Sequence, residues 1–319
     1  MTRSNKIALA IHGGAGEDSN TLNKKNMAPK GKLLIIGGED ICGGSGVEDS
    51  LKYQLKHLMI LKDLLPKNKR VHHIEVLTTS MEIPGEIKTA YMNAFEKIGY
   101  STIGFINILN KEEARKEEYE NRIAMAGTIL FCGSDQFCIT SIIGGTTIEE
   151  IISEKYYHDE DFIMSGFNAG ATAITRIMIV GGGKEETLVN RDLKTGLGLG
   201  WLKNCIIDTH FIKKGRFGRL AHAITMNPAE LGIGLGEDAA IVILNGNIAI
   251  CYGEGSVVMI DGKHITQTNI ADEIHGAPVF VEGLKVHLLV KGCQFIFDER
   301  KLIQPVASTA KSYSSNIPG

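Results

Sequence analysis

The hexapeptide SGFNAG, residues 165–170, has the residue types of a nucleophile elbow. It follows the apolar run DFIM and precedes the apolar, helix-like run ATAITRIMIV, so the pattern predicts a strand, a tight turn and a helix. Many α/β hydrolases present their nucleophile at such a turn, between small residues. The central position is Asn168, whose delocalised amide nitrogen is no nucleophile in this chemistry. The stretch is an active site, an active site without its nucleophile, or an ordinary turn.

A second group of residues that could take part in catalysis or binding lies in IIDTHFIKKGRFGRLAHAI, residues 206–224. An apolar run ends there in Asp208 and His210, and a cluster of cations follows, made of Lys213, Lys214, Arg216 and Arg219. A histidine after a strand is either structural or a general base, and the elbow upstream makes the second role a candidate. The cations are either a solvated helix start or a carboxylate-binding group, for which arginine forks are well suited.

Three other stretches end apolar runs. GIGLGEDAAIVI, residues 232–243, places Glu237 and Asp238 at the mouth of a strand, where an acid can orient an imidazole. FCGSDQF, residues 131–137, can turn a backbone N–H into a cleft at the carboxyl ends of strands. GGEDICGGSG, residues 37–46, fits neither a dinucleotide fingerprint nor a P-loop, so we interpret it as a strand-to-helix turn.

The elements that must position these residues alternate along the chain. From about residue 32, short β-rich runs such as KLLIIGG and HIEVLTTS are separated by amphipathic stretches such as PGEIKTAYMNAFEKIG. This alternation predicts an α/β fold with a mostly parallel sheet covered by helices on both faces. After residue 240 the runs become short and hairpin-like, which predicts an antiparallel C-terminal extension. The charged stretch NKEEARKEEYENRIAMAG is interpreted as a solvated helix.

Length and composition limit the alternatives. The chain has 319 residues, 43% of them hydrophobic, and no internal repeat or linker, so we expect a single α/β domain over residues 31–303. Residues 1–30 are expected to form an irregular N-terminal segment and residues 304–319 a flexible tail. A net charge of −3 argues against nucleic-acid binding, and no apolar stretch reaches membrane-spanning length.

The cysteines and the N-terminus indicate the compartment. The N-terminal stretch has no small-residue cleavage site, so no secretory signal is expected. The six cysteines lack metal or disulfide spacing and are expected to be reduced thiols of a cytoplasmic protein; they are Cys42, Cys132, Cys138, Cys205, Cys251 and Cys293. No HExxH or His/Cys pairing is present, so we expect neither a metal nor a cofactor.

Taken together, these stretches resemble the cyanophycinase family of serine exopeptidases, relatives of aspartyl dipeptidase. The matching segments are GKLLIIGGED, FCGSDQFCITSIIGGTT, GFNAGATA, GLGLGWLKNCIIDTHFIKKGRFGRL, GIGLGEDAA and YGEGSVVMID, in the family's order over about residues 30–262. The resemblance implies a class I glutamine-amidotransferase-like, or flavodoxin-like, sheet and often a homodimer. It also implies metal-free hydrolysis of cyanophycin, a polyaspartate bearing arginine on each side-chain carboxyl, to β-Asp-Arg dipeptides.

The resemblance assigns roles residue by residue. The general base falls on His210, the orienting acid on Glu237 and the serine nucleophile on Asn168. The implied oxyanion donors are backbone N–H groups at Gly133, Ser134 and Ala169, and the implied substrate contacts are Asp135, Gln136, Thr209, Lys214, Arg216 and Arg219. Three positions depart from the family besides Asn168: Ser134 replaces a usual glycine, Thr209 a usual glutamine and Lys214 a usual arginine.

Asn168 matters most among these departures, because an amide offers His210 no hydroxyl proton to remove. Loss of the serine in triad hydrolases costs on the order of 10⁶ in rate. The sequence therefore predicts a cyanophycinase-like hydrolase that is impaired or inactive as written. The alternative is a non-catalytic protein that binds arginine-bearing β-aspartyl peptides. Ser165 and Thr172 lie three and four positions from the elbow and are not expected to substitute for the serine.

Two further enzyme classes are alternatives that fewer residues support. IALAIHGGAG, residues 7–16, resembles the first strand of plant-type asparaginases and isoaspartyl peptidases, which keeps a β-aspartyl dipeptidase or asparaginase-type amidohydrolase open. That family needs an internal threonine in a Thr-Val-Gly-like setting, which the chain lacks. A small-molecule amidotransferase would need a cysteine at the elbow, and Cys132 and Cys138 are too far away in sequence.

Overall fold

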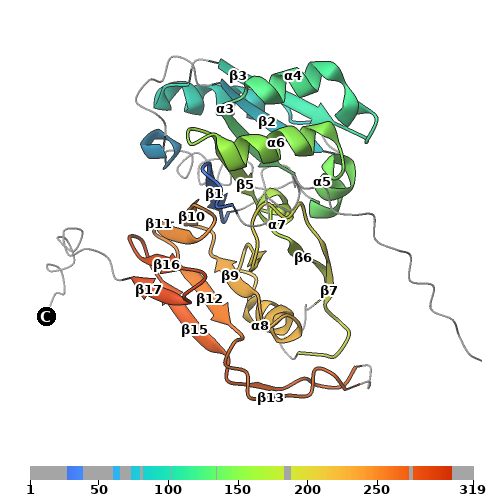
Figure 1. Ribbon diagram of the computed structural model, residues 1–319, viewed down its shortest axis with the longest axis vertical. Helices are drawn as coiled ribbons and strands as arrows, with labels where there is room; N and C mark the ends of the chain where they lie inside the picture. Colours follow the sequence, from blue (N-terminus) through green and yellow to red (C-terminus); the bar gives the residue numbers. More distant parts are fainter. Residues whose placement is uncertain are drawn as a thin grey trace, which may run out of the picture.

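The structure is a computed structural model that describes residues 27–38, 60–64, 73–79, 82–100, 102–133, 135–182, 188–272 and 276–303. Within these ranges the chain forms a mixed α/β fold built on two main sheets (Figure 1). Most of the expected N-terminal segment, the whole expected tail, and most of GGEDICGGSG lie outside the described residues, as does the IHGGAG stretch.

The larger sheet has a parallel half and an antiparallel half. Its described strands run in the order β17-β16-β11-β10-β1-β5-β4-β2-β3. The parallel half consists of β1 (Lys32–Ile36), β5 (Ile163–Phe167), β4 (Thr128–Cys132), β2 (His73–Thr79) and β3 (Thr102–Ile108). The antiparallel half consists of β10 (Ala239–Leu244), β11 (Ile248–Gly253), β16 (Gln294–Ile296) and β17 (Lys301–Ile303). Strand β1 joins the halves, since it pairs with β5 on one side and β10 on the other.

Both faces of the parallel half are buried, which explains the uninterrupted apolar character of its strands. In β1, Leu34 and Ile36 pack on the face covered by α3 (Gly85–Ile98), while Leu33 and Ile35 point to the opposite face. That opposite face is covered by α4 (Glu117–Met125), α5 (Gln136–Ile143), α6 (Thr147–His158) and α7 (Ala169–Ala173). The two helical layers fix the carboxyl ends of the parallel strands at one edge of the sheet.

The second sheet lies against the antiparallel half. Its described strands run in the order β15-β12-β9-β8, with bounds Lys285–Leu289, Val257–Asp261, Leu231–Leu235 and Cys205–Asp208. One face contributes Ile207 and Met259 to the core shared with the larger sheet. The other face is covered by α8 (Phe217–Met226) and contributes Ile206 and Ile260 to a separate cluster. Strand β8 contacts α7, the helix that follows β5, although it belongs to another sheet.

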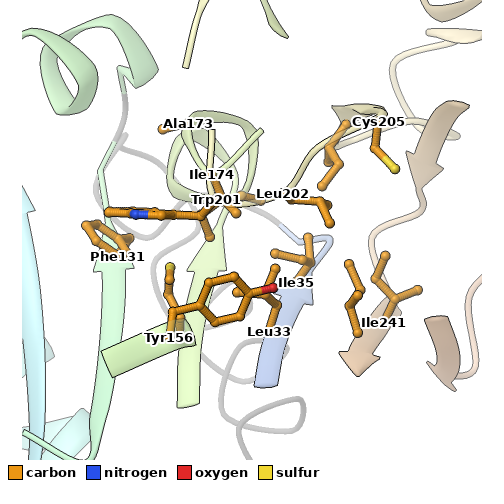
Figure 2. Close-up of a cluster of buried hydrophobic side chains, with 14 of the residues drawn as sticks. Leu33, Ile35, Phe131, Tyr156, Ala173, Ile174, Trp201, Leu202, Cys205 and Ile241 are labelled. Carbon is orange, nitrogen blue, oxygen red and sulfur yellow. The ribbon is translucent and has the colours of Figure 1, made fainter. Parts of the chain in front are cut away.

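The shared core packs directly beneath the elbow. Figure 2 shows Trp201 lying along the ring of Phe131, with Ala173 and Ile174 of the α7 region beside them. The two ring centroids are 5.5 Å apart. Trp201 and Phe131 are almost completely buried, so the turn after β5 rests on a close-packed support.

Several expectations about local structure can now be compared with the fold. The predicted helix in PGEIKTAYMNAFEKIG is confirmed as α3, which follows Pro84 and ends at Gly99 with φ of 99°. The charged stretch is confirmed as the largely exposed α4 and the short 3-10 helix η3 (Glu113–Arg115). The expectation that ATAITRIMIV continues as a helix is wrong, because α7 ends at Ala173 and the run then enters β6 (Ile177–Gly181).

Strand β6 pairs with β7 (Lys194–Leu197), an interaction between distant segments that helical spacing cannot reveal. A further two-stranded ribbon joins β13 (Gln267–Thr268) to β14 (Val281–Glu282). The separate sheet of β8, β9, β12 and β15 was also not anticipated, since alternating strands and helices suggest one continuous sheet.

Candidate active site

The turn after β5 has the backbone of a nucleophile elbow. Asn168 sits between β5 and α7 with φ of 45° and ψ of −109°, a conformation that is strained for a residue with a side chain. Gly166 and Gly170 make this turn possible. A Cβ on Gly166 would lie 2.7 Å from the carbonyl carbon of Gly170, and one on Gly170 would lie 2.5 Å from the carbonyl oxygen of Phe131. The glycine spacing in GFNAG is therefore a packing requirement.

The Asn168 side chain makes no hydrogen bond. It is 7% exposed, and both its Oδ1 and its Nδ2 are buried without a partner. The backbone is held instead, because its carbonyl accepts hydrogen bonds from the N–H and the hydroxyl of Thr172, each at 3.1 Å. A buried carboxamide with two open hydrogen-bonding groups is costly, and such groups in native proteins call for an explanation.

A second strained turn follows β8 and faces the same space. His210, with φ of 53°, begins the loop that connects β8 to α8. Its backbone carbonyl accepts the Lys214 N–H at 3.2 Å, and the Arg216 N–H bonds back to the carbonyl of Phe211 at 3.0 Å. These bonds tighten the loop over residues 210–216 and bring its cations back toward the end of β8.

The two turns enclose one pocket of about 220 Å³. Its described lining consists of Gln136, Asn168, Ala169, Thr172, Ile179, Val180, Ile207, Asp208, Thr209, His210, Lys214, Arg216 and Arg219. Most of the residues singled out in the sequence thus converge from α5, the elbow and the loop after β8. The pocket lies where α/β sheets bind ligands, beyond the carboxyl ends of strands.

Lys214, Arg216 and Arg219 form a basic wall of this pocket, and Asp208 holds the two arginines of that wall in place. Its carboxylate is 2% exposed and accepts from Arg219 Nε at 2.8 Å, from Arg219 Nη2, and from Arg216 Nη1 at 3.2 Å. Arg216 Nη1 also donates to the carbonyl of Thr209 at 2.7 Å. A buried carboxylate with bidentate arginine pairing holds both guanidinium groups in fixed positions.

Three cations share the pocket with that single described acid. Lys214, Arg216 and Arg219 carry three positive charges, against the negative charge of Asp208 in the lining and that of Glu237 nearby. Burial, followed by the charges of Arg216 and Arg219, lowers the pKa of Lys214, and burial also lowers the pKa of Arg216. The wall therefore presents net positive charge to an incoming ligand.

The same environment keeps His210 neutral. Burial first, then the charges of Lys214, Arg216 and Arg219, lowers the pKa of His210 from 6.5 to about 4. The ring is consequently uncharged at neutral pH, as a general base must be. At that pH it can accept one hydrogen bond and donate one.

The remaining residues expected at the site lie around the pocket. Gln136 Nε2 donates to the carbonyl of Ile179 at 2.8 Å, which ties α5 to β6 across the opening. Asp135 is the N-cap of α5 and accepts from the N–H groups of Phe137 and Cys138. Gly133 directly follows β4 but is not among the lining residues, and Ser134 lies outside the described residues.

Glu237 is also absent from the pocket lining, although its charge acts on Lys214 and Arg216. Its Oε1 accepts the backbone N–H of Lys213 at 3.0 Å, so it braces the loop that carries His210. Among the described residues, no hydrogen bond joins Glu237 to the His210 ring. Asp208 is the residue whose importance sequence reasoning missed, although its position two residues before His210, just ahead of a run of cations, was a usable signal.

The described residues offer neither a metal site nor a membrane-spanning helix. No group of three or more His, Cys, Asp or Glu side chains there is arranged to hold a metal ion. Among the helices that the structure describes, none combines the length and the apolar character that crossing a bilayer requires.

Comparison with known proteins decides the family. The model of peptidase family S51 matches residues 41–251, which include the elbow, the basic wall and Glu237. The chain belongs to peptidase family S51. The S51 match covers about two thirds of the chain and ends within β11.

Curated relatives and a solved structure agree with the S51 assignment. A cyanophycinase from Nostoc sp. is 29% identical over 237 residues, covering 73% of this chain and 78% of the relative. A cyanophycinase from Geminocystis herdmanii is 26% identical over 234 residues, covering 73% and 85%. The crystal structure of a peptidase from an acI-B1 Actinobacterium is similar in fold, with a TM-score of 0.56 at 18% identity, covering 84% of this chain and 98% of that one.

Proposed function

We propose that this S51 protein carries a cyanophycinase-type site for β-Asp-Arg peptides in which Asn168 occupies the nucleophile position. The observation that carries the proposal is the elbow itself. A strained φ of 45°, two glycines with no room for a side chain, and a neutral histidine on the facing turn form the arrangement of a serine hydrolase. The cyanophycinase relatives supply the substrate class.

The proposed reaction is acyl transfer through a serine at position 168. Its hydroxyl would attack the α-carbonyl of an aspartate in the polyaspartate backbone while His210 takes the proton, and the backbone N–H groups of Gly133 and Ala169 would hold the oxyanion. Cleavage of that backbone amide leaves the β-linked arginine in place, so the product is β-Asp-Arg. His210 would then give the proton to the leaving amine, and water would hydrolyse the ester. Glu237 would support His210 by bracing the loop over residues 210–216 through its bond to Lys213.

With Asn168 in place, the first step fails. The carboxamide has no hydroxyl proton for His210 to remove and no oxygen nucleophile to form the ester. Catalysis is then limited to what substrate positioning and the oxyanion donors provide, some 10³- to 10⁴-fold over water in hydrolases that lack a triad member. We therefore propose that the chain is severely impaired as a peptidase.

The second candidate function is a binding protein for arginine-bearing β-aspartyl peptides. The observation that favours it is the preserved basic wall, in which Asp208 still holds Arg216 and Arg219 beside a bare Asn168. Some serine and asparagine codons differ by a single base, so one mutation is enough to exchange the two residues. The exchange is either natural or introduced. Either origin leaves the ligand-binding groups in place.

The experiment that tests the proposal compares the chain with its Asn168→Ser variant. Both are incubated with soluble cyanophycin, and released β-Asp-Arg is measured by chromatography. Release by the variant alone supports the proposed site, whereas a folded variant that releases nothing contradicts it. Binding of the peptide by the unchanged chain without release supports the binding function, and absence of both contradicts the two candidates together.

We infer a class I glutamine-amidotransferase-like sheet, related to the flavodoxin-like arrangement, in which the strands from β10 onward form an antiparallel C-terminal extension. A homodimer in the cytoplasm is the expected state of the protein, and size-exclusion chromatography with light scattering tests the oligomer directly.

A further inference from the structure

The carboxamide of Asn168 has no hydrogen-bond partner within the described protein. It is more than nine-tenths buried, it lines the pocket, and both its hydrogen-bonding atoms are open. A carboxamide offers one acceptor and a donor in a fixed plane, so its natural complement is another amide, which offers the same pair in reverse. A ligand amide placed against Asn168 would satisfy both atoms at once.

The basic wall sets a second requirement, which concerns the charge of the ligand. Arg216 and Arg219 are held by Asp208, and Lys214 stands beside them, which leaves net positive charge facing the cavity. Both oxygens of Asp208 already accept from arginine. The described lining therefore has no open carboxylate for a guanidinium, and a cationic side chain gains nothing by entering. A ligand carboxylate would neutralise the wall.

From these two features we infer that the pocket binds a β-aspartyl unit. The free α-carboxylate of that unit would bind the basic wall, and its amide would bind Asn168. The residue joined to the β-carboxyl would not be recognised. This inference deepens the proposed function and rests on it for the location of the site. The two groups sit on adjacent carbons in a β-aspartyl unit, which suits a cavity of about 220 Å³. The arginine of a β-Asp-Arg dipeptide projects out of the pocket.

The first test changes the ligand and leaves the protein intact. Binding of three synthetic dipeptides to the unaltered chain is measured by calorimetry: β-Asp-Arg, β-Asp-Ala, and β-Asp-Ala with its aspartyl α-carboxylate converted to a carboxamide. We expect the first two to bind within about threefold of each other. The amidated peptide is expected to bind about 10- to 100-fold more weakly, because it loses charge-assisted hydrogen bonds.

Two variants that change only the side chain at position 168 then test the amide contact. Asn168→Ala removes both hydrogen-bonding atoms and is expected to weaken β-Asp-Ala binding about tenfold. Asn168→Asp keeps the shape but removes the donor and adds a negative charge beside the ligand carboxylate, so a larger loss is expected. Thermal melts of both variants establish that they are folded before affinities are compared.

The inference is overturned if β-Asp-Ala fails to bind while β-Asp-Arg binds, because the arginine is then the group recognised. It is also overturned if the amidated peptide binds as well as the free acid, or if Asn168→Ala binds as tightly as the unaltered chain. These outcomes are separate from failure of the proposed function, which is decided by dipeptide release from the Asn168→Ser variant.

Discussion

The two turns that meet at the pocket differ in how they are held. The turn after β8 is densely bonded: Asp208 binds Arg216 and Arg219, and Glu237 accepts from the loop backbone. The elbow after β5 has an equally constrained backbone but an unbonded side chain, since neither polar atom of Asn168 has a partner. Under the proposed function, the turn after β8 is the half that would recognise a ligand, and the elbow is the half that would react with it, with Asn168 at the nucleophile position.

Under the proposed function, this difference would separate ligand binding from chemistry within one site. Both turns hold a non-glycine residue at positive φ, Asn168 at 45° and His210 at 53°, so strain has been retained on both sides. Retained strain without a nucleophile is consistent with a pocket that still selects its ligand. The predictions below change one turn at a time.

The largest effect is expected from restoring the nucleophile. Asn168→Ser supplies a hydroxyl at the elbow, opposite a neutral His210, and is expected to raise the rate of β-Asp-Arg release by between about 10³- and 10⁶-fold. The measurement is dipeptide release from cyanophycin under identical conditions. Asn168→Ala is the matched control, because it relieves the same steric bulk without providing a nucleophile and should stay inert.

The next effect concerns the densely bonded turn. Asp208→Asn removes the charge that pairs with two buried guanidinium groups and is expected to cost about 3 kcal/mol of unfolding free energy. Urea denaturation of the variant and the parent measures the difference. As a control, Glu254→Gln removes one partner of an exposed pair with Lys291 and should change stability by less than about 1 kcal/mol. Equal effects at the two positions would contradict the organising role of Asp208.

A smaller effect is expected from crowding the elbow. Gly170→Ala places a methyl group 2.5 Å from the Phe131 carbonyl oxygen, and we expect a loss of about 1–3 kcal/mol in unfolding free energy. Gly85→Ala is the matched control, because a Cβ there meets no atom within 4 Å and Gly85 is exposed at the first position of α3. A neutral Gly170→Ala would show that the elbow packs less tightly than described.

The smallest change is a shift in a titration. Burial and the neighbouring cations lower the pKa of His210 to about 4, so its ring signals in an NMR titration should have their midpoint near pH 4. His210→Gln assigns the signals. Because the unfolded chain takes up this proton near pH 6.5, the group's contribution to stability falls as the pH is lowered from about 6.5 to about 4. A midpoint at or above 6.5 would contradict the buried, cation-flanked setting.

Local patterns predicted those parts of the fold whose causes are local. The helix α3 was predictable because its proline start, its apolar spacing and its terminal Gly99 all lie within one stretch. The run from Ala171 to Val180 was misread as one helix because its change to β6 depends on pairing with β7, about 17 residues further along the chain. Apolar runs of this length do not distinguish a helix from a strand.

The site was predictable to a similar extent. The elbow, His210 and the cations were singled out by their residue types and spacing, and the structure brings Asn168, His210, Lys214, Arg216 and Arg219 to one pocket. The role of Asp208 was not predicted, since it depends on Arg216 and Arg219 folding back from the next helix turn onto the end of β8. The position of Glu237 on the Lys213 backbone also depends on the loop geometry rather than on spacing.

The most direct test of the central claim is a calorimetric titration of the unaltered chain with β-Asp-Arg, followed by chromatography of the same sample. If the recognising half is complete and the reacting half lacks its nucleophile, the peptide binds saturably with one site per chain. A soluble cyanophycin sample treated in parallel then releases no dipeptide. Release of dipeptide by the unaltered chain, or absence of saturable binding, would contradict the account.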